Sequence, residues 1–328
     1  MNSPVSPCDG GSSPLMPPAE FAASRLPALL KEAGAAAWGI ADCTDGVDAA
    51  DTAAYTRWLE RGCHAGMDYM ARNRDVRTTP ALLLPRARSM ICCAFSYEPP
   101  QPGTVIAAYA LGTDYHEVIR SRLGQVARAM EEATGCQTRV CVDTAPLRER
   151  YWASKCGVGF RGLNGHLIVP GKGSYMLLGE ILTTVSLPST PALDRDCGMC
   201  RRCVAACPAG ALQPDGTVDA RRCLSYLTIE HRGPFPEGTE LHGRLYGCDA
   251  CAMACPHNAC ATGSETVPEL LRRPAVAALN AAAAAVMTQE QFSTIFTHSA
   301  IKRAKLAGLQ RNACALAATQ LGHLKKNE

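Results

Sequence analysis

Hydrophobic residues recur three or four positions apart in several segments, which predicts amphipathic helices. The clearest pattern covers residues 114–134, and weaker ones cover 50–72 and a segment that starts near residue 19. Thr288 and Gln291 have the spacing of a capping box, which predicts that a helix begins there. Helices should therefore lie at both ends of the chain and in its middle.

Other segments are apolar without a helical period, which predicts strands. The run from Ser89 to Tyr97 is apolar almost throughout and is typical of a strand buried on both faces. Further strands are expected at 36–40, 104–110 and 139–142, and a β-hairpin at 166–169 and 174–179 around residues 170–173. Strands that alternate with helices up to about residue 190 predict an α+β fold with an α/β-like core.

Asp143 directly follows the strand expected at 139–142 and precedes a helix expected at 146–156. In open α/β sheets, residues at such a strand end face the ligand crevice. An aspartate before a helix is equally suited to cap it. The pattern alone leaves a crevice residue and a helix cap as alternatives for Asp143.

Composition limits the class of protein. The 328 residues suggest about two domains, 47% of them are apolar, and the formal net charge is +3. No apolar run is long enough for a transmembrane helix. The first 18 residues are rich in Pro, Ser and Gly and predict a disordered tail rather than an export signal, so we expect a cytoplasmic protein.

Eight of the 18 cysteines lie between Cys197 and Pro256. Their spacing is Cys-x2-Cys-x2-Cys-x3-Cys-Pro, then a lone Cys223, then Cys-x2-Cys-x3-Cys-Pro. The first run is the bacterial ferredoxin pattern, in which three thiolates bind one 4Fe–4S cluster and the fourth binds the other. This predicts two clusters, one held by Cys197, Cys200, Cys203 and Cys255, the other by Cys207, Cys223, Cys248 and Cys251.

Zinc and disulfides are the alternatives. Zinc sites use paired Cys-x2-Cys knuckles but not this crossed pattern, and disulfides are rare in a reducing cytoplasm. Two oxidised clusters would bring the protein to a net charge of about −1, so overall charge does not indicate nucleic acid. The last expected helix carries a local basic cluster, Lys302, Arg303, Lys305 and Arg311, which predicts either a solvated helix face or contact with phosphates.

Longer motifs make the chain resemble the epoxyqueuosine reductase family. They are the segments 142–150 (Val-Asp-Thr-Ala-Pro-Leu-x-Glu-Arg), 179–183 (Gly-Glu-Ile-Leu-Thr), 223–230, 246–251 and 310–313, together with Arg77 to Pro85 and Asp114-Tyr115-His116. The resemblance covers about residues 20–315.

The resemblance implies a function. The family reduces epoxyqueuosine to queuosine at the wobble base of tRNA, with cobalamin and two 4Fe–4S clusters, on a cobalamin-binding core similar to that of reductive dehalogenases. It also implies a tRNA anticodon stem-loop as the partner of the basic cluster. We further expect a monomer that takes electrons from a reduced donor of flavodoxin or ferredoxin type and does not bind membranes.

The resemblance also implies roles for single residues. Asp143 is the proton donor, supported by Asp114, Tyr115 and His116, and the residues at cobalamin-contacting positions are Arg77, Asp143, Leu167, Ser225 and Asp249. A carboxyl ordinarily ionises near pH ~3.9. Burial must therefore raise the pKa of Asp143 if it is to act as an acid at neutral pH.

Two rivals share the cysteine pattern. One is a corrinoid iron–sulfur reductase of a small molecule, and the other is a ferredoxin-like electron carrier without its own active site. This chain also has Leu163 where the family often has lysine, and it lacks the helical-repeat extension of longer members. The expected parts are a tail (1–18), a cobalamin-binding catalytic core (19–190), a two-cluster domain (191–262) and C-terminal helices (263–328) that are candidates for contact with tRNA.

Overall fold

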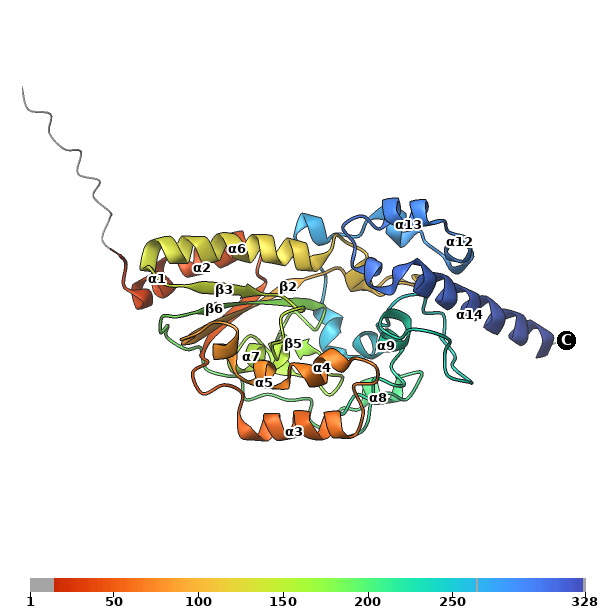
Figure 1. Ribbon diagram of the computed structural model, residues 1–328, viewed down its shortest axis with the longest axis horizontal. Helices are drawn as coiled ribbons and strands as arrows, with labels where there is room; N and C mark the ends of the chain where they lie inside the picture. Colours follow the sequence, from red (N-terminus) through yellow and green to blue (C-terminus); the bar gives the residue numbers. More distant parts are fainter. Residues whose placement is uncertain (1–14, 264, 327–328) are drawn as a thin grey trace, which may run out of the picture.

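The computed structural model describes residues 15–263 and 265–326, so most of the expected tail lies outside the described residues. A four-stranded antiparallel sheet forms its centre, in the order β1-β2-β6-β3 (Figure 1). The strands are β1 (Ala37–Asp42), β2 (Ser89–Ser96), β3 (Thr138–Cys141) and β6 (Met176–Thr183). All eight residues of β2 are buried, as the continuous apolar run predicts.

Helices cover both faces of this sheet (Figure 1). Because side chains alternate along a strand, Ile91 packs with one helical layer and Met90 with the other. The first layer consists of α1 (Pro18–Ser24), α2 (Leu26–Glu32) and α6 (Tyr115–Thr134). The opposite side carries α3 (Ala49–Glu60), α4 (Asp68–Arg72), α5 (Arg74–Thr78), η1 (Pro80–Leu82) and α7 (Glu149–Lys155).

Two strand expectations were wrong. The segment 104–110 contains the 3-10 helix η2 (Ala108–Ala110). The backbone N–H groups of Ala107 and Ala108 donate to the carbonyl of Tyr246 and to Oδ2 of Asp249, not to a neighbouring strand of the sheet. Of the expected hairpin only the turn forms: Val169 and Gly173 make an antiparallel bridge, but β5 (Leu167–Ile168) pairs with β4 (Phe160–Arg161) in a separate sheet. The segment after the turn is apolar on both faces, so β6 is buried between β2 and β3.

The cysteine-rich segment forms short elements: α8 (Arg202–Ala205), α9 (Leu224–Ile229), α10 (Ala250–Met253) and η3 (Pro256–Cys260). The chain then forms η4 (Pro268–Leu270), α11 (Pro274–Ala277), α12 (Ala281–Ala285), α13 (Gln289–Ile295), η5 (Ala300–Ala304) and α14 (Lys305–Lys326). The expected capping box at Thr288 is confirmed. No helix among residues 15–263 and 265–326 is long and apolar enough to cross a membrane.

Candidate functional site

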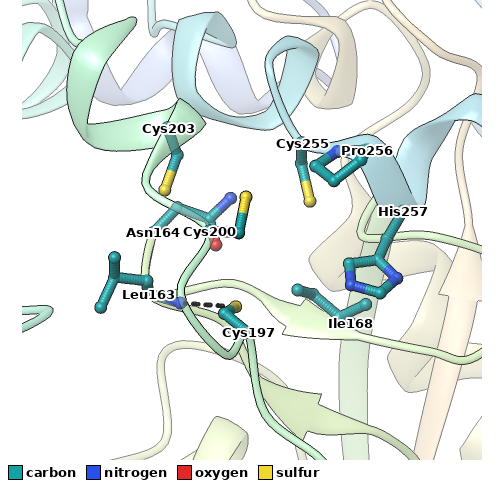
Figure 2. A pocket seen from close by; sticks show the side chains of 9 residues that line it. All are labelled: Leu163, Asn164, Ile168, Cys197, Cys200, Cys203, Cys255, Pro256 and His257. Atoms are coloured by element: carbon teal, nitrogen blue, oxygen red, sulfur yellow. Dashed lines mark hydrogen bonds between the residues drawn. The ribbon is translucent and has the colours of Figure 1, made fainter.

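Four of the predicted cluster cysteines line one cavity. Cys197, Cys200, Cys203 and Cys255 surround it together with Leu163, Asn164 and Ile168 (Figure 2). They come from three places: the loop before α8, α8 itself and the residue before η3. The backbone N–H of Leu163 donates to Sγ of Cys197 at 3.3 Å. Such N–H···S bonds stabilise a thiolate that binds a metal cluster.

The other four cysteines form a second group. Burial, followed by the neighbouring thiols of Cys248, Cys223, Cys207 and Cys203, raises the pKa of Cys251 to about 12. The backbone of Ala211 donates to Sγ of Cys207 at 3.2 Å. Nε2 of His166 lies 3.7 Å from Sγ of Cys251. The fold thus gathers the first four predicted cysteines around one cavity and places the other four close to one another and to Cys203.

In the described part of the chain, no three His, Cys, Asp or Glu side chains are placed to hold a single metal ion. A zinc ion would need sulfur atoms at about 2.3 Å from one centre. Four thiols around a cavity suit a larger, multi-iron group.

A histidine between two aspartates forms the polar part of the site. Asp114 caps α6 by accepting the backbone N–H of His116, and the same oxygen lies 2.6 Å from Nδ1 of that histidine. Nε2 of His116 lies 3.0 Å from Oδ2 of Asp143. Burial lowers the pKa of His116, but the hydrogen bonds to Asp114 and Asp143 outweigh it and raise the pKa to about 9.

The expected rise in the pKa of Asp143 was wrong. Partial burial raises this pKa, but the hydrogen bond and positive charge of His116 outweigh it, and the pKa is lowered. The proton of this pair therefore resides on His116. Asp143 does not cap the next helix either, because α7 begins at Glu149 and has Arg148 at its N-cap.

The backbone places the Asp143 side chain where a ligand could meet it. Asp143 has φ +46°, a left-handed conformation that is uncommon outside glycine. Its N–H donates to Oε1 of Glu149 at 2.5 Å. Its side chain is 55% exposed, whereas that of His116 is 22% exposed. The ring of Tyr115 stacks on His116 with centroids 4.0 Å apart.

Two family descriptions match this chain. "Epoxyqueuosine reductase QueG, DUF1730" matches residues 77–144, and "4Fe-4S double cluster binding domain" matches residues 196–258. The epoxyqueuosine reductase of Synechococcus sp. (strain RCC307) is 38% identical over 305 residues, covering 88% of this chain and 94% of that protein. The chain belongs to the epoxyqueuosine reductase family.

Solved epoxyqueuosine reductases have the same fold. A crystal structure of the enzyme with an epoxyqueuosine-modified tRNA-Tyr stem loop matches with a TM-score of 0.82 at 28% identity, covering 89% of this chain and 80% of that one. The Bacillus subtilis enzyme, with a catalytic aspartate loop swung out of its active site, matches at 0.81 and 26% with the same coverage. Membership of the epoxyqueuosine reductase family argues against both rivals.

Of the five residues that the resemblance assigns to cobalamin contact, Arg77 and Leu167 are buried, Ser225 and Asp249 are half-buried and Asp143 is exposed. Arg77 is 8% exposed; Nη1 donates to the carbonyl of Leu147 at 3.4 Å, and its buried Nε has no partner among the described residues. Leu167 is 3% exposed. Oδ2 of Asp249 accepts the N–H of Ala108 at 2.8 Å, and burial raises the pKa of Asp249.

Asp249 and Arg244 line a hollow beside the loop 100–104. Ser225 lies in the first turn of α9, two residues after Cys223. Ser225 comes from a different element than Arg77, which lies on α5. A cofactor that touches all of these positions would have to bridge several elements of the fold.

The basic cluster divides into two kinds of residue. Arg303 forms a bidentate ion pair with Glu230, and Arg311 donates to the carbonyls of Leu227, His231 and Gly233. Lys302 and Lys305 are exposed. The expectation that all four lie on the last helix was wrong, because Lys302 and Arg303 belong to η5 and α14 begins at Lys305.

Sequence reasoning assigned no role to Glu149 and Glu180, although both lie in the motifs that resemble the family. Glu149 holds the amide of Asp143, and Glu180 is completely buried in β6. The signal that could have revealed Glu180 is a charged residue inside an apolar strand. For Glu149 no signal in the sequence shows that it reaches back to Asp143.

Proposed function

We propose that this epoxyqueuosine reductase converts epoxyqueuosine in tRNA to queuosine with two 4Fe–4S clusters, a cobalamin and the His116–Asp143 pair. The reaction takes up two electrons and two protons, forms a carbon–carbon double bond and releases the epoxide oxygen as water. The observation that carries the proposal is the charged His116 beside an exposed Asp143, within a chain that has two groups of four thiols.

The eight cysteines fit two clusters. We assign one to Cys197, Cys200, Cys203 and Cys255, and the other to Cys207, Cys223, Cys248 and Cys251. The cavity between the first four supports the first set. Besides burial, Cys248 and Cys207 raise the pKa of Cys223, which supports the second set, and Cys203 also raises the pKa of Cys251, so the two sets are close neighbours. A reduced flavodoxin or ferredoxin would supply the electrons.

Cobalamin would supply a strongly reducing cobalt centre for the epoxide carbon when it is bound. Arg77, Leu167, Ser225 and Asp249 would hold it. The buried, unpartnered Nε of Arg77 supports this assignment, because such a donor is costly to bury unless a ligand accepts its hydrogen bond. The hollow lined by Asp249 and Arg244 is a second supporting feature.

His116 and Asp143 would deliver the proton. At neutral pH the imidazolium holds its proton between two carboxylates, and Asp114 fixes the orientation of the ring. When a ligand covers Asp143 and excludes water, the charged carboxylate becomes less favourable and its pKa rises. A proton then passes from Nε2 of His116 to Oδ2 of Asp143 and on to the departing oxygen.

Lys302 and Lys305 are the best candidates for contact with the tRNA stem-loop, because they are exposed. A homologue was crystallised with such a stem loop, which supports an RNA substrate here. We retain the proposed division into a catalytic core (19–190), a two-cluster domain (191–262) and C-terminal helices (263–328).

The test is nucleoside analysis of tRNA from a strain that lacks this gene. Epoxyqueuosine should accumulate, and the intact gene should restore queuosine whereas a gene with Asp143→Asn should not. Normal queuosine in the deletion strain would reject the proposed function.

A further inference from the structure

A buried carboxyl group lies beneath the loop that carries Asp143. Glu180 is 0% exposed in β6, and its register partners are Cys92 on β2 and Cys141 on β3. Both of its carboxyl oxygens are buried, and no donor among the described residues binds either of them. An ionised carboxylate in such a place is very costly, so Glu180 must be neutral or share a proton.

The acid that faces Glu180 at hydrogen-bonding range is Glu149. Glu149 is the first residue of α7, and its Oε1 already accepts the amide of Asp143. Ionised carboxylates only accept hydrogen bonds, so two of them can bond only when one carries a proton. Burial and the charge of Asp143 raise the pKa of Glu149 to about 7, and burial raises the pKa of Glu180 well above its usual range.

The other titratable groups around Glu149 and Glu180 do not remove the proton from this pair. Glu180 faces the thiols of Cys92, Cys141 and Cys156, and the side chain of Cys93 lies on the opposite face of the sheet. Burial raises the pKa of Cys92, Cys93 and Cys141, so these thiols are neutral. On the side of Glu149, the charged groups are Asp143, Arg150 and His116. Among the described residues, the groups that chiefly shift the pKa of Glu180 include no cation.

Asp143 needs support from its backbone. It has φ +46°, and the next amide, Thr144 N–H, donates to the carbonyl of Val142 at 2.5 Å, so the chain turns sharply here. Such conformations persist where surrounding contacts hold them. The bond from Asp143 N–H to Glu149 is a contact of this kind, and it fixes the direction in which the Asp143 side chain leaves the turn.

We propose that Glu149 and Glu180 share one proton, and that this acid pair is a positioning device that holds Asp143 against His116. The protonated carboxyl of Glu180 donates a hydrogen bond to Glu149. Glu149 uses its other lone pairs to accept the hydrogen bond from the backbone N–H of Asp143. Neither glutamate touches the substrate. The proposal deepens the proposed role of Asp143 and depends on it for its effect on turnover.

The first test does not depend on activity. Infrared spectra of the reconstituted protein near neutral pH should contain the C=O band of a buried carboxylic acid, and Glu180→Gln should remove it. Glu131→Gln is the matched control, because the carboxylate of Glu131 accepts hydrogen bonds from the backbone N–H and the hydroxyl of Thr138 and so needs no proton. A wild-type band that survives in Glu180→Gln overturns the shared proton.

The second test concerns positioning. Gln at position 180 still donates a hydrogen bond to Glu149, so Glu180→Gln should keep turnover close to wild type. Glu180→Leu cannot donate, and kcat should fall about ten- to a hundredfold without a change in KM for the stem-loop, because misplacing a catalytic group has costs of that size. Equal kcat in the Gln and Leu variants overturns the positioning role.

Glu149→Ala covers the case in which Glu180→Leu does not fold. It removes the acceptor of the Asp143 amide, so hydrogen exchange of the peptide that contains Asp143 should become about five- to tenfold faster, which is the effect of removing one hydrogen bond. Unchanged exchange overturns the support by Glu149. If the wild type has the infrared band but does not reduce epoxyqueuosine, the proposed function fails and the shared proton stands.

Discussion

Nε2 of His116 lies 3.0 Å from Oδ2 of Asp143, although 27 positions separate the two residues in the sequence. His116 lies in the first turn of α6, and Asp143 lies in the turn after β3. The contact reverses the expected direction of the Asp143 pKa, since the imidazolium stabilises the carboxylate more than burial destabilises it. At neutral pH the proton of the pair therefore lies on His116, and the side chain of Asp143 is exposed.

The variant Asp143→Asn should lose turnover and keep its cofactors. Asparagine can still contact His116 but cannot pass a proton, so kcat should fall by about 10²–10⁴-fold, the usual contribution of a general acid. Iron content and the visible spectrum of the reconstituted protein should be unchanged. Asp45→Asn is the control, because Asp45 is exposed in the loop after β1 and should tolerate the change fully. Full turnover by Asp143→Asn would contradict the proton-donor role.

Activity should fall at high pH because of His116. Its pKa is raised from 6.5 to about 9, so the proton that the pair delivers is lost as the pH rises through about 9. The same shift adds stability that is fully present below pH 6.5 and disappears through pH 9. His116→Gln should remove both effects. The measurements are kcat against pH and urea unfolding at several pH values, and identical profiles for variant and wild type would contradict this assignment.

The parts of the fold that follow from local sequence were predicted correctly. The apolar run at 89–97 is a buried strand, and 115–134 is a helix capped by Asp114. Strand partners were not predictable, because β6 pairs with β2 and β3, which lie about 90 and about 40 positions away respectively, and not with the adjacent β5. The His116–Asp143 contact and the hydrogen bonds of Arg311 to main-chain carbonyls could not be predicted for the same reason, because the partners are far apart in the sequence.

Cys223 has no Cys-x2-Cys partner, which makes its assignment to a cluster the most informative one to test. The variant Cys223→Ser should lose the second cluster and keep the first, so iron should fall from about eight to about four atoms per chain. Iron analysis and electron paramagnetic resonance of the reduced protein measure this. Cys314→Ser is the control, since Cys314 is exposed on α14. Full iron content in Cys223→Ser would remove Cys223 from the ligand set.

The two kinds of basic residue in the C-terminal segment should respond differently to substitution. The double variant Lys302→Gln, Lys305→Gln should bind the stem-loop more weakly and with a smaller salt dependence. The log–log slope should decrease by about 0.7–0.9 for each phosphate that the protein no longer neutralises. Its thermal stability should not change, because both side chains are exposed. Lys31→Gln, an exposed lysine on α2, is the matched control and should keep the wild-type slope.

Arg311→Gln should do the opposite. The substitution removes the hydrogen bonds that the guanidinium donates to the carbonyls of Leu227, His231 and Gly233. It also removes the cation–π contact with Phe235, in which the guanidinium lies 4.2 Å from the ring centroid. The free energy of unfolding should fall by about 1–3 kcal/mol, as expected when polar groups are deprived of a charged partner. The salt slope of RNA binding should stay at the wild-type value, because this arginine is already engaged with the protein. An unchanged slope in the double lysine variant would contradict the lysine contact, and a changed slope in Arg311→Gln would show that this arginine contacts the RNA.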